Sequence, residues 1–331
     1  MRIAVDAMGG DYAPQAIIPG VIDALKELKG IAQITLVGKK EIIDKELSLY
    51  QTNGLSIAIK DAKDVIEMHE SPTVALKTKK DSSIVVATKA LRENEVQAFV
   101  SAGNTGAVMA GSLMTLGRLK GVFRPAIATV IPTLEGVSIL LDVGANVDCK
   151  PIHLLQFAMM GDVYAKYILG KSNPTIGLLS IGEEKGKGNV LTFEAFKLIS
   201  SSSLNFVGNV EGRDIINGKV DVIVCDGFVG NVVLKFGESL AEMIFGFLKR
   251  ELSKNLKLKL GAYLTKPAFK KFKKLLDYSE YGGAPLLGIK GVCIICHGAS
   301  SAKAIKNGIR VASEFINHQV NLHIEERIKG K

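Results

Sequence analysis

The chain has 331 residues, 47% of them hydrophobic, which is enough for one large core or two adjoining lobes. No uninterrupted apolar run reaches the roughly 18 residues of a membrane-spanning helix, and the N-terminus, with Asp6 and glycines soon after it, lacks a signal-peptide pattern. The net charge of +9 is local, because residues 249–274 hold ten basic side chains against one acid. Four cysteines in such a chain do not predict a disulfide framework, and we expect a cytoplasmic protein.

Apolar runs of strand length alternate with segments of helical spacing along the chain. The expected strands are 3–7, 34–37, 55–59, 99–101, 127–131, 138–141, 175–181, 205–207, 220–225 and 292–296. The expected helices cover 84–92, 151–169, 190–200 and 300–316. Two earlier helices end near residues 28 and 49, one helix begins within 99–119, and another begins near 231. This alternation predicts a doubly wound, mostly parallel α/β sheet with helices in layers on both sides, and no linker divides the single two-lobed unit 1–331.

The corner between strand and helix at 99–119 has the composition of an anion site. Gly103 and Gly106 permit close backbone approach, and Asn104 or Thr105 can cap the helix. The free N–H groups of a helix start then favour phosphate. An ordinary turn between strand and helix would carry the same glycines, so the corner alone leaves both interpretations open.

Six of the expected strands end in a glycine-containing corner. Corners of parallel strands share the carboxyl edge, where ligands bind in open α/β sheets, so we expect a single active-site face. The polar side chains expected to reach it are Asp6, Asp142, Asp226, Lys185, Lys187, Arg213 and His297. An acid at a strand end can also cap the neighbouring helix, which is the role we expect for Asp6.

Several familiar motifs do not occur in the sequence. The loop 182–189 lacks the spacing of a nucleotide-binding P-loop, and neither a G-x-G-x-x-G corner nor a G-x-S-x-G elbow occurs. Residues 293–297 match the C-x-x-C-H haem pattern literally, but they lie in an apolar strand, and no second cysteine pair offers a zinc site. We therefore expect neither a metal nor a cofactor.

Six longer motifs follow one another in the chain. They are DAMGGDYAP at 6–14, SAGNTG at 101–106, LLDVGANVDCKP at 140–151, GEEKGKGN at 182–189, CDGFVGN at 225–231 and HGAS at 297–300. Together they closely resemble the bacterial phosphate acyltransferase family, which makes acyl phosphate from acyl-acyl carrier protein and inorganic phosphate for phospholipid synthesis. The resemblance covers nearly the whole chain and implies a three-layer fold like that of phosphotransacetylases and isopropylmalate dehydrogenase, working as a homodimer.

The resemblance also implies a site for phosphate and thioester. His297 is the candidate for orienting phosphate or donating to the oxyanion, Asp226 for orienting His297 or phosphate, and Asn231 for donating to the carbonyl oxygen. The implied phosphate-binding residues are Gly103, Asn104, Thr105, Gly106, Lys185, Lys187, Gly298, Ser300 and Ser301. His297 could instead bond only to backbone, and the two lysines could be solvated loop charges.

A covalent route through Cys225 or Cys296 is less favoured than direct attack by phosphate. Both thiols lie in apolar strand runs, where a cysteine behaves as a small hydrophobic residue without a depressed pKa.

The basic segment is predicted to form an amphipathic hairpin over 245–278. Its contact residues are Leu256, Leu258, Leu260, Phe269, Phe272, Lys270, Lys271, Lys273 and Lys274. A helix with lysines opposite an apolar face suits an anionic membrane surface, and the same lysines could dock the acidic acyl carrier protein. A solvated lid or dimer arm is the plainer alternative. Nucleic acid is disfavoured, because the segment has no tryptophan and no recognisable binding motif.

Three functions follow from these observations. The first is an acyltransferase that feeds glycerophospholipid synthesis at the membrane, where the downstream glycerol-3-phosphate acyltransferase is a further expected partner. The second is a phosphotransacetylase-like enzyme that uses acyl-CoA. The third is a non-catalytic membrane scaffold, which could keep the basic hairpin.

Overall fold

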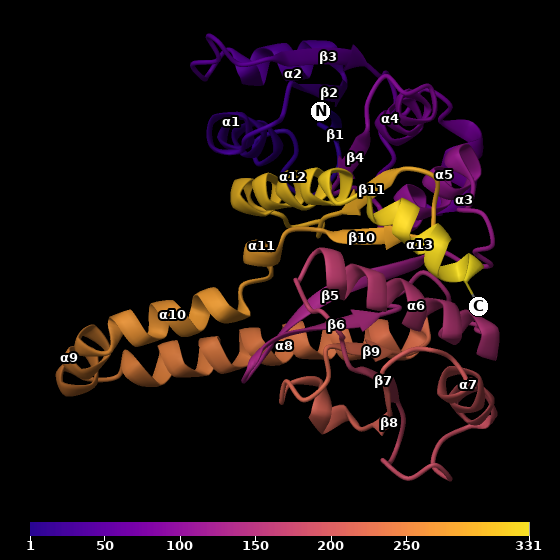
Figure 1. Cartoon of the computed structure of the whole chain (residues 1–331). Coiled ribbons are helices and arrows are strands. Elements are labelled where there is room, and N and C mark those ends of the chain that lie inside the picture. The colour runs from indigo at the N-terminus through magenta and orange to yellow at the C-terminus, as the bar shows by residue number, and fades with distance from the viewer. Residues whose placement is uncertain (331) are drawn as a thin grey trace.

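The computed structural model describes residues 1–330, except for the side chains of Lys273, Lys274, Leu276 and Tyr278, and contains a mixed sheet of 11 strands (Figure 1). The strands are β1 (Arg2–Asp6), β2 (Gln33–Gly38), β3 (Ile57–Asp61), β4 (Ala98–Ser101), β5 (Ala126–Thr133), β6 (Gly136–Leu141), β7 (Ile176–Leu179), β8 (Phe206–Val210), β9 (Val222–Val224), β10 (Ala284–Leu287) and β11 (Val292–Ile295). Their order across the sheet is β3-β2-β1-β4-β11-β10-β5-β6-β9-β7-β8.

Two parallel blocks of strands make up most of the sheet. Lobe one consists of β3, β2, β1, β4 and β11, and lobe two of β6, β9, β7 and β8. Between them, β10 is antiparallel to both neighbours, and β5 and β6 form the antiparallel pair predicted around Glu135 and Gly136. These antiparallel steps reverse the strand direction between the lobes. The expected single carboxyl edge is therefore wrong: each lobe has its own.

Helices cover both faces of the sheet, which confirms the predicted layered α/β class. One face carries α1 (Ile17–Glu27), α2 (Lys40–Leu47), α6 (Pro151–Tyr167), α7 (Val190–Ser200), α12 (Ala302–Asn317) and α13 (Val320–Lys329). The other face carries α3 (Pro72–Thr78), α4 (Ser83–Arg92), α5 (Thr105–Leu116) and the start of α8 (Gly227–Leu252). A short 3-10 helix covers Gly212–Ile215.

Strand residues alternate between the two apolar layers. Ile3 and Val5 of β1 pack in one layer while Ala4 packs in the other, and in β9 Ile223 faces opposite to its two valine neighbours. Because both faces of the sheet are buried, its strands read as continuous apolar runs, which is why the sequence located them.

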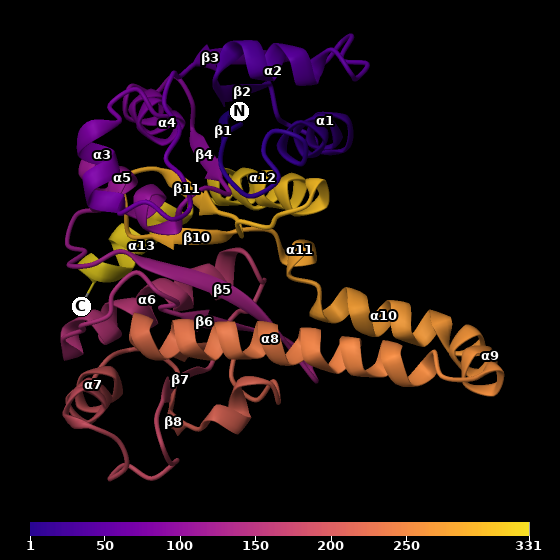
Figure 2. The same cartoon turned by 180° about the vertical axis from the view of Figure 1, so that it is seen from behind.

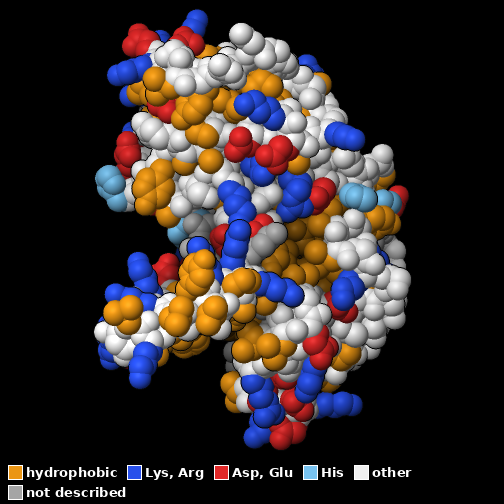
Figure 3. Space-filling view, turned by 90° about the vertical axis from the view of Figure 1, so that its left-hand side faces the viewer, with side chains coloured by type: hydrophobic (Ala, Val, Ile, Leu, Met, Phe, Trp, Pro, Cys, Tyr) orange, Lys and Arg blue, Asp and Glu red, His pale blue; other side chains and the backbone are white. Residues whose placement is uncertain are grey.

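A helical arm stands away from both lobes (Figures 1 and 2). It comprises residues 245–278, with the end of α8, then α9 (Leu256–Leu264) and α10 (Lys266–Leu276), before α11 (Tyr278–Tyr281) returns to lobe one. In the space-filling view, hydrophobic and basic side chains lie next to each other over this arm (Figure 3). Over the described residues, every helix is too short or too polar to cross a membrane.

Candidate functional site

Asp6, at the end of β1, is buried and links the loops that follow β1 and β4. Its carboxylate accepts hydrogen bonds from Met8 N (3.1 Å) and Ser101 Oγ (2.7 Å), and Ser101 Oγ accepts one from Gly103 N (3.0 Å). Burial raises the pKa of Asp6, although hydrogen bonds from Ser83 and Ser101 oppose the shift. The expected role as a helix cap is wrong, because this side chain, 1% exposed, instead ties the corner of β1 to that of β4.

Asn104 orders the corner after β4. Its Oδ1 accepts from Ala107 N (3.0 Å), which confirms the predicted cap of α5. Its Nδ2 donates to the carbonyl oxygens of Glu67, Met68 and Glu70 at 3.3, 3.1 and 3.0 Å. The amide therefore holds the loop 67–70 against the start of α5. Because these contacts occupy the Asn104 side chain, a ligand at this corner would bind to the backbone N–H groups of the helix start.

The first turn of α5 offers that backbone. Thr105 is exposed and Gly106 is half-buried, and their N–H groups have no hydrogen-bond partner within the described part of the chain. A Cβ on Gly106 would lie 2.6 Å from Pro72 Cγ, so this glycine also allows α3 to pack on α5. The corner thus combines an ordinary packing role with a helix start suited to an anion.

The corner after β11 lies beside the corner after β4, because Ile295 pairs with Ser101. The loop that follows β1 crosses it: Asp11 N donates to Gly298 O (2.8 Å), and a Cβ on Gly10 would lie 2.8 Å from the same oxygen. Gly10 has φ +103°, which favours glycine. The structure therefore brings the two predicted corners together, with Gly298 partly covered.

His297 is exposed in this corner and faces α8 of lobe two. Ala299 N donates to His297 Nδ1 (3.1 Å), and Lys235 Nζ lies 3.3 Å from His297 Nε2. Lys235 also pairs with Glu238 at 2.8 Å. Because α12 begins directly after its cap, Ser301, a cation and an imidazole from different lobes meet beside a helix start.

Ser300 lies within the same turn, where its N–H donates to His297 O (3.0 Å). Its side chain is 2% exposed, and the hydroxyl has no hydrogen-bond partner among the residues that the structure describes. A buried hydroxyl of this kind costs free energy, so it marks the corner as a place where a polar partner would be stabilising.

Asn231 lies on the same face of α8 as Lys235, one helical turn earlier, and contacts the loop around Gly144. Asp226 caps α8, where its Oδ1 accepts from Val229 N (2.8 Å). Lys235 lies about 13 Å further along the helix, at 1.5 Å per residue. The hydrogen bond of Asp226 therefore stabilises the start of α8, whereas His297 contacts Lys235 further along the helix.

Asp142, at the end of β6, is closed off from any ligand. The carboxylate accepts from Ile127 N (3.0 Å), Ala145 N (3.0 Å), Asn146 N (2.7 Å) and Asn146 Nδ2 (2.9 Å), and the residue is 0% exposed. Burial raises its pKa, although these hydrogen bonds oppose the shift. The expectation that Asp142 reaches the active-site face is wrong, because α8 packs directly over it.

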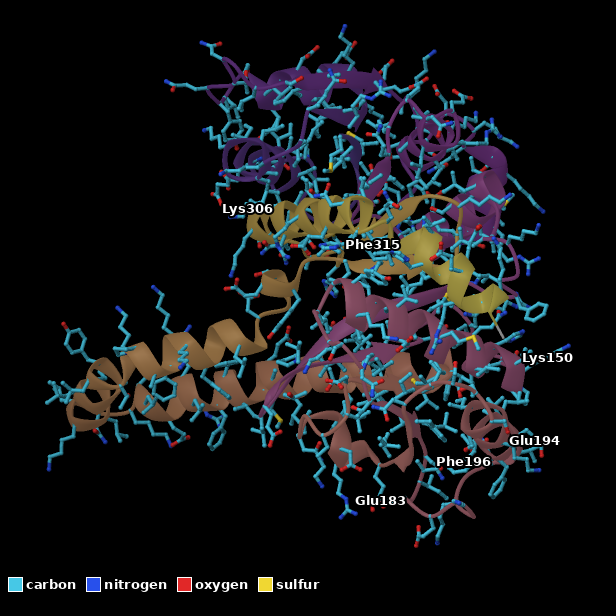
Figure 4. The ribbon with its side chains drawn as sticks, in the orientation of Figure 1. Lys150, Glu183, Glu194, Phe196, Lys306 and Phe315 are labelled. Atoms are coloured by element: carbon cyan, nitrogen blue, oxygen red, sulfur yellow. The ribbon has the colours of Figure 1, made fainter. Side chains whose placement is uncertain are left out.

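Lys185 and Lys187 are exposed in the loop after β7. Asn209 Nδ2 and Ser180 Oγ hold this loop through its carbonyl oxygens, and Arg213 pairs with Glu183 at 3.5 Å. Glu183 lies at the lower end of the molecule in Figure 4, whereas α12, marked by Lys306 and Phe315, lies in the upper half. The structure therefore does not bring these lysines to the corner of His297.

The cysteine thiols are poor nucleophiles in this fold. Burial raises the pKa of Cys293 and of Cys296 to about 12 and that of Cys225 well above its ordinary value. The half-buried Cys149 also has its pKa raised to about 12 by burial. Their arrangement supports direct attack over a covalent route. Within residues 1–330, His, Cys, Asp and Glu side chains form no cluster that could hold a metal ion.

Lys235 is the site residue that the sequence analysis missed. The sequence predicted only that a helix starts near Asn231, so no residue after the motif at 225–231 was assigned to a face of α8. Helical spacing counted from Asn231 would have put Lys235 beside it. The contact with His297 itself had no signal in the sequence, because it joins the two lobes.

The layered sheet and the junction of its lobes define a class of α/β proteins with solved members. A phosphotransacetylase from Streptococcus pyogenes superposes with a TM-score of 0.61 at 14% identity, covering 97% of this chain and 94% of that one. A branched-chain phosphotransacylase from Enterococcus faecalis gives a TM-score of 0.58 at 17% identity, covering 96% of this chain and 99% of that one. At such low identity, these similarities establish the fold alone.

Sequence similarity then gives the family. The model of the family described as "Fatty acid synthesis protein" matches residues 1–323. A phosphate acyltransferase of Geotalea uraniireducens is 55% identical over 329 residues, which is 99% of this chain and 94% of the relative. The chain belongs to this family, that of the bacterial phosphate acyltransferases, so it is a transferase and not a non-catalytic scaffold.

Proposed function

We propose that the protein forms acyl phosphate from fatty acyl-acyl carrier protein and inorganic phosphate, and that the product feeds glycerophospholipid synthesis. The observation that carries the proposal is the junction of the lobes, where His297, just before α12, contacts Lys235 of α8, and Asn231 lies one turn earlier on the same face of that helix. Donors from both lobes converge there on the space that a phosphate and a thioester carbonyl would share.

In the proposed reaction, a phosphate oxygen attacks the thioester carbonyl carbon. A C–O bond forms, the C–S bond breaks, and the electron pair leaves with the sulfur as the thiolate, which then takes up a proton. Phosphate would lie between the start of α5, at Thr105 and Gly106, and the corner of His297. Asn231 would donate to the developing oxyanion. Asp226 acts as a positioning residue, because its cap fixes the first turn of α8.

Turnover of the purified protein tests this assignment. Formation of acyl phosphate from acyl-acyl carrier protein and phosphate is measured with His297→Ala and with Asn231→Ala, and each is expected to lower kcat about tenfold or more. His318→Ala is the matched control, since this exposed histidine lies at the opposite end of α12. Urea unfolding verifies that each variant is folded. Unchanged turnover in both site variants would show that the site assignment is wrong.

The acyl donor is a separate question. A phosphotransacetylase-like enzyme that uses acyl-CoA would share the phosphate corners, and the solved neighbours of this fold include such enzymes. We expect a higher kcat/KM with long-chain acyl-acyl carrier protein than with the matching acyl-CoA, because the basic arm complements an acidic carrier. A higher kcat/KM with acyl-CoA would favour the alternative.

The arm is the proposed contact with an anionic membrane surface. Leu256, Leu260 and Tyr263 are 87, 61 and 71% exposed, and Leu258 and Phe272 are 40 and 41% exposed. Phe269 is half-buried, Lys270 and Lys271 are exposed, and the side chains of the other two predicted contacts, Lys273 and Lys274, lie outside the described part of the structure. Apolar side chains beside lysines support binding to the membrane interface.

Sedimentation with vesicles that contain anionic lipid tests the arm. Lys270→Glu with Lys271→Glu should reduce binding, because each lysine near such a surface contributes about 1 kcal/mol. Lys40→Glu with Lys45→Glu on α2 changes the net charge equally at exposed positions away from the arm. Equal binding by the two double variants would argue against the membrane contact.

We also propose a homodimer, and a functional association with the downstream glycerol-3-phosphate acyltransferase at the membrane. Exposed apolar side chains along α8 support the dimer, since Phe236, Met243 and Phe247 are 68, 62 and 54% exposed. Light scattering should give twice the mass of the chain for the wild type and half that value for a Phe236→Glu, Phe247→Glu variant. A monomeric wild type would refute the dimer.

A further inference from the structure

Two hydrogen-bond donors, the Lys235 ammonium and the Ala299 N–H, face the two nitrogens of the His297 ring. An ammonium group only donates hydrogen bonds, and so does the backbone N–H of Ala299. These donors face Nε2 and Nδ1 of the same ring at 3.3 and 3.1 Å. A neutral imidazole has one in-plane lone pair, so it can accept from one of these neighbours but not from both.

An anion at this point resolves the conflict. If Nδ1 keeps the hydrogen bond from Ala299, then Nε2 carries the proton and points toward Lys235. An acceptor oxygen between them takes hydrogen bonds from both Nε2–H and the ammonium. Lys235 has three N–H groups, so it can keep its pairing with Glu238 at 2.8 Å while it donates to the anion.

We propose that Lys235 supplies the counter-charge for phosphate, and that the arriving anion takes Lys235 from His297 and fixes the imidazole as the Nε2–H tautomer. This inference rests on the proposed function and replaces the role first given to Lys185 and Lys187. It makes Lys235 a phosphate-binding residue and His297 a hydrogen-bond donor to the same anion.

The surroundings favour the side of His297 that faces lobe two. Beside Gly298, the Asp11 carboxylate lies 3.6 Å from the point where a Cβ on this glycine would be, so it repels an anion next to Gly298. Toward lobe two, Lys235 and Asn231 present a cation and an amide on one face of α8. Ser300, with its buried hydroxyl, lies in the same turn as the imidazole.

Phosphate affinity is the first test. The dissociation constant for inorganic phosphate is measured by calorimetry on the full chain, for wild type, Lys235→Met and Lys235→Gln. Loss of one charge-assisted hydrogen bond should weaken binding about tenfold or more. Lys197→Met is the matched control, because Lys197 also pairs with a glutamate three residues away at 2.8 Å on an exposed helix. Wild-type affinity in both Lys235 variants would refute the proposal, as would an equal loss in the control.

The tautomer of His297 gives a readout that a merely structural lysine would not move. Nitrogen-15 spectra of histidine-labelled protein are recorded at about pH 8.5, above the usual titration range of histidine, and His297→Gln assigns its signals. Phosphate should shift wild-type His297 to the Nε2–H tautomer. In Lys235→Met the same phosphate concentration should shift the tautomer less, because the counter-charge that binds the anion is gone. A His297 spectrum unchanged by saturating phosphate would contradict the exchange.

Kinetics separate this inference from the proposed function. Lys235→Met should raise KM for phosphate about tenfold or more, while KM for the acyl donor changes by less than about twofold. If the wild type binds phosphate with the expected tautomer change but forms no acyl phosphate, the proposed function fails and the anion site stands. If acyl phosphate forms and KM for phosphate is unchanged in Lys235→Met, the proposed function stands and the role of Lys235 is refuted.

Discussion

In each lobe, one strand leads into a buried aspartate, Asp6 in β1 and Asp142 after β6, and the two corners differ in what surrounds that carboxylate. Asp142 in lobe two accepts hydrogen bonds from three backbone N–H groups, which cannot reverse direction, and from the Asn146 amide, whose orientation is held by a second hydrogen bond to Pro125 O at 2.7 Å. Asp6 in lobe one accepts from the backbone N–H of Met8 and from the hydroxyls of Ser101 and Ser83, and a hydroxyl can either donate or accept. The lobe-two corner is rigidly specified, whereas the lobe-one corner is more adaptable.

The corners also differ in how closely the next helix approaches. In lobe two, Gly227 and Gly230 let the first turn of α8 pack against the backbone around Asp142. In lobe one, the corners after β4 and β11 lead to helix starts with exposed residues, Thr105 and Ser301. The same strand-and-aspartate pattern therefore closes one corner and leaves the other open. In the proposed site, lobe two contributes the later turns of α8 instead of its closed corner.

The closed corner should be the most sensitive point of the fold. A Cβ on Gly230 would lie 1.9 Å from Asp142 O, a backbone atom that cannot move aside, so Gly230→Ala should cost about 4 kcal/mol in the free energy of unfolding or prevent folding. Gly237→Ala in the same helix meets nothing within 4 Å and should be neutral or stabilising by up to about 1 kcal/mol. Urea unfolding measures both, and a well-folded Gly230→Ala variant would mean that the corner is less closely packed than described.

The two aspartates themselves should respond unequally to an isosteric change. Asp142→Asn places an NH₂ group against fixed N–H donors, so we expect a loss of about 3 kcal/mol. Asp6→Asn should cost about 1 kcal/mol, because the Ser101 hydroxyl can turn to accept from the new NH₂ group. Chemical denaturation of both variants at neutral pH gives the comparison. Equal losses would remove the distinction between a rigid and an adaptable corner.

Much of the fold was predictable because burial on both faces leaves continuous apolar runs. The helix Val190–Ser200 and the antiparallel pair β5 and β6 match their predictions closely. The short strand β10 was missed, since Ala284–Leu287 has only four residues after a glycine pair. That strand and the β5–β6 pair set the direction of lobe two, so missing β10 hid the fact that the lobes have separate carboxyl edges.

The candidate site was predictable only where one segment carries it. The cap by Asn104 and the helix start at Ser301 follow from local spacing, and both are present. The three carbonyl contacts of Asn104 Nδ2 and the contact between Lys235 and His297 join residues 34 to 62 positions apart. Contacts of that separation depend on how loops, helices and lobes pack in three dimensions, which hydrophobic periodicity does not encode. A glycine-rich motif suggested that Lys185 and Lys187 bind phosphate. Their loop follows β7, however, and so lies at the carboxyl edge of lobe two, whereas His297 lies at the carboxyl edge of lobe one.

Asn104 gives a smaller test of the open corner. Asn104→Asp keeps the oxygen that caps α5 but turns a carboxylate oxygen toward the carbonyls of Glu67, Met68 and Glu70, so we expect a loss of about 1–2 kcal/mol. Hydrogen exchange of peptides covering 61–72 should become faster. Asn189→Asp is the control, because Asn189 caps α7 through its oxygen, and an aspartate caps equally well. If exchange over 61–72 stayed slow, the loop would be held by something other than Asn104.

The smallest effect is a difference in pH dependence between Asp6 and Asp221, a half-buried aspartate that is paired with Lys171. Burial raises the pKa of Asp6 above 3.8, so its favourable contribution is full below about pH 4 and is lost as pH rises through the folded-state pKa. At Asp221, desolvation raises the pKa, but hydrogen bonds from Thr175 and Lys171 outweigh it and lower the pKa below 3.8, so stability is lost as pH falls. The free energy of unfolding of wild type minus Asp6→Asn should therefore decrease between pH 4 and pH 7, whereas wild type minus Asp221→Asn should increase from pH 2 to pH 4. If both differences in the free energy of unfolding changed in the same direction with pH, burial would not be what sets the pKa of Asp6. Water would then have to reach the Asp6 carboxylate in the open corner.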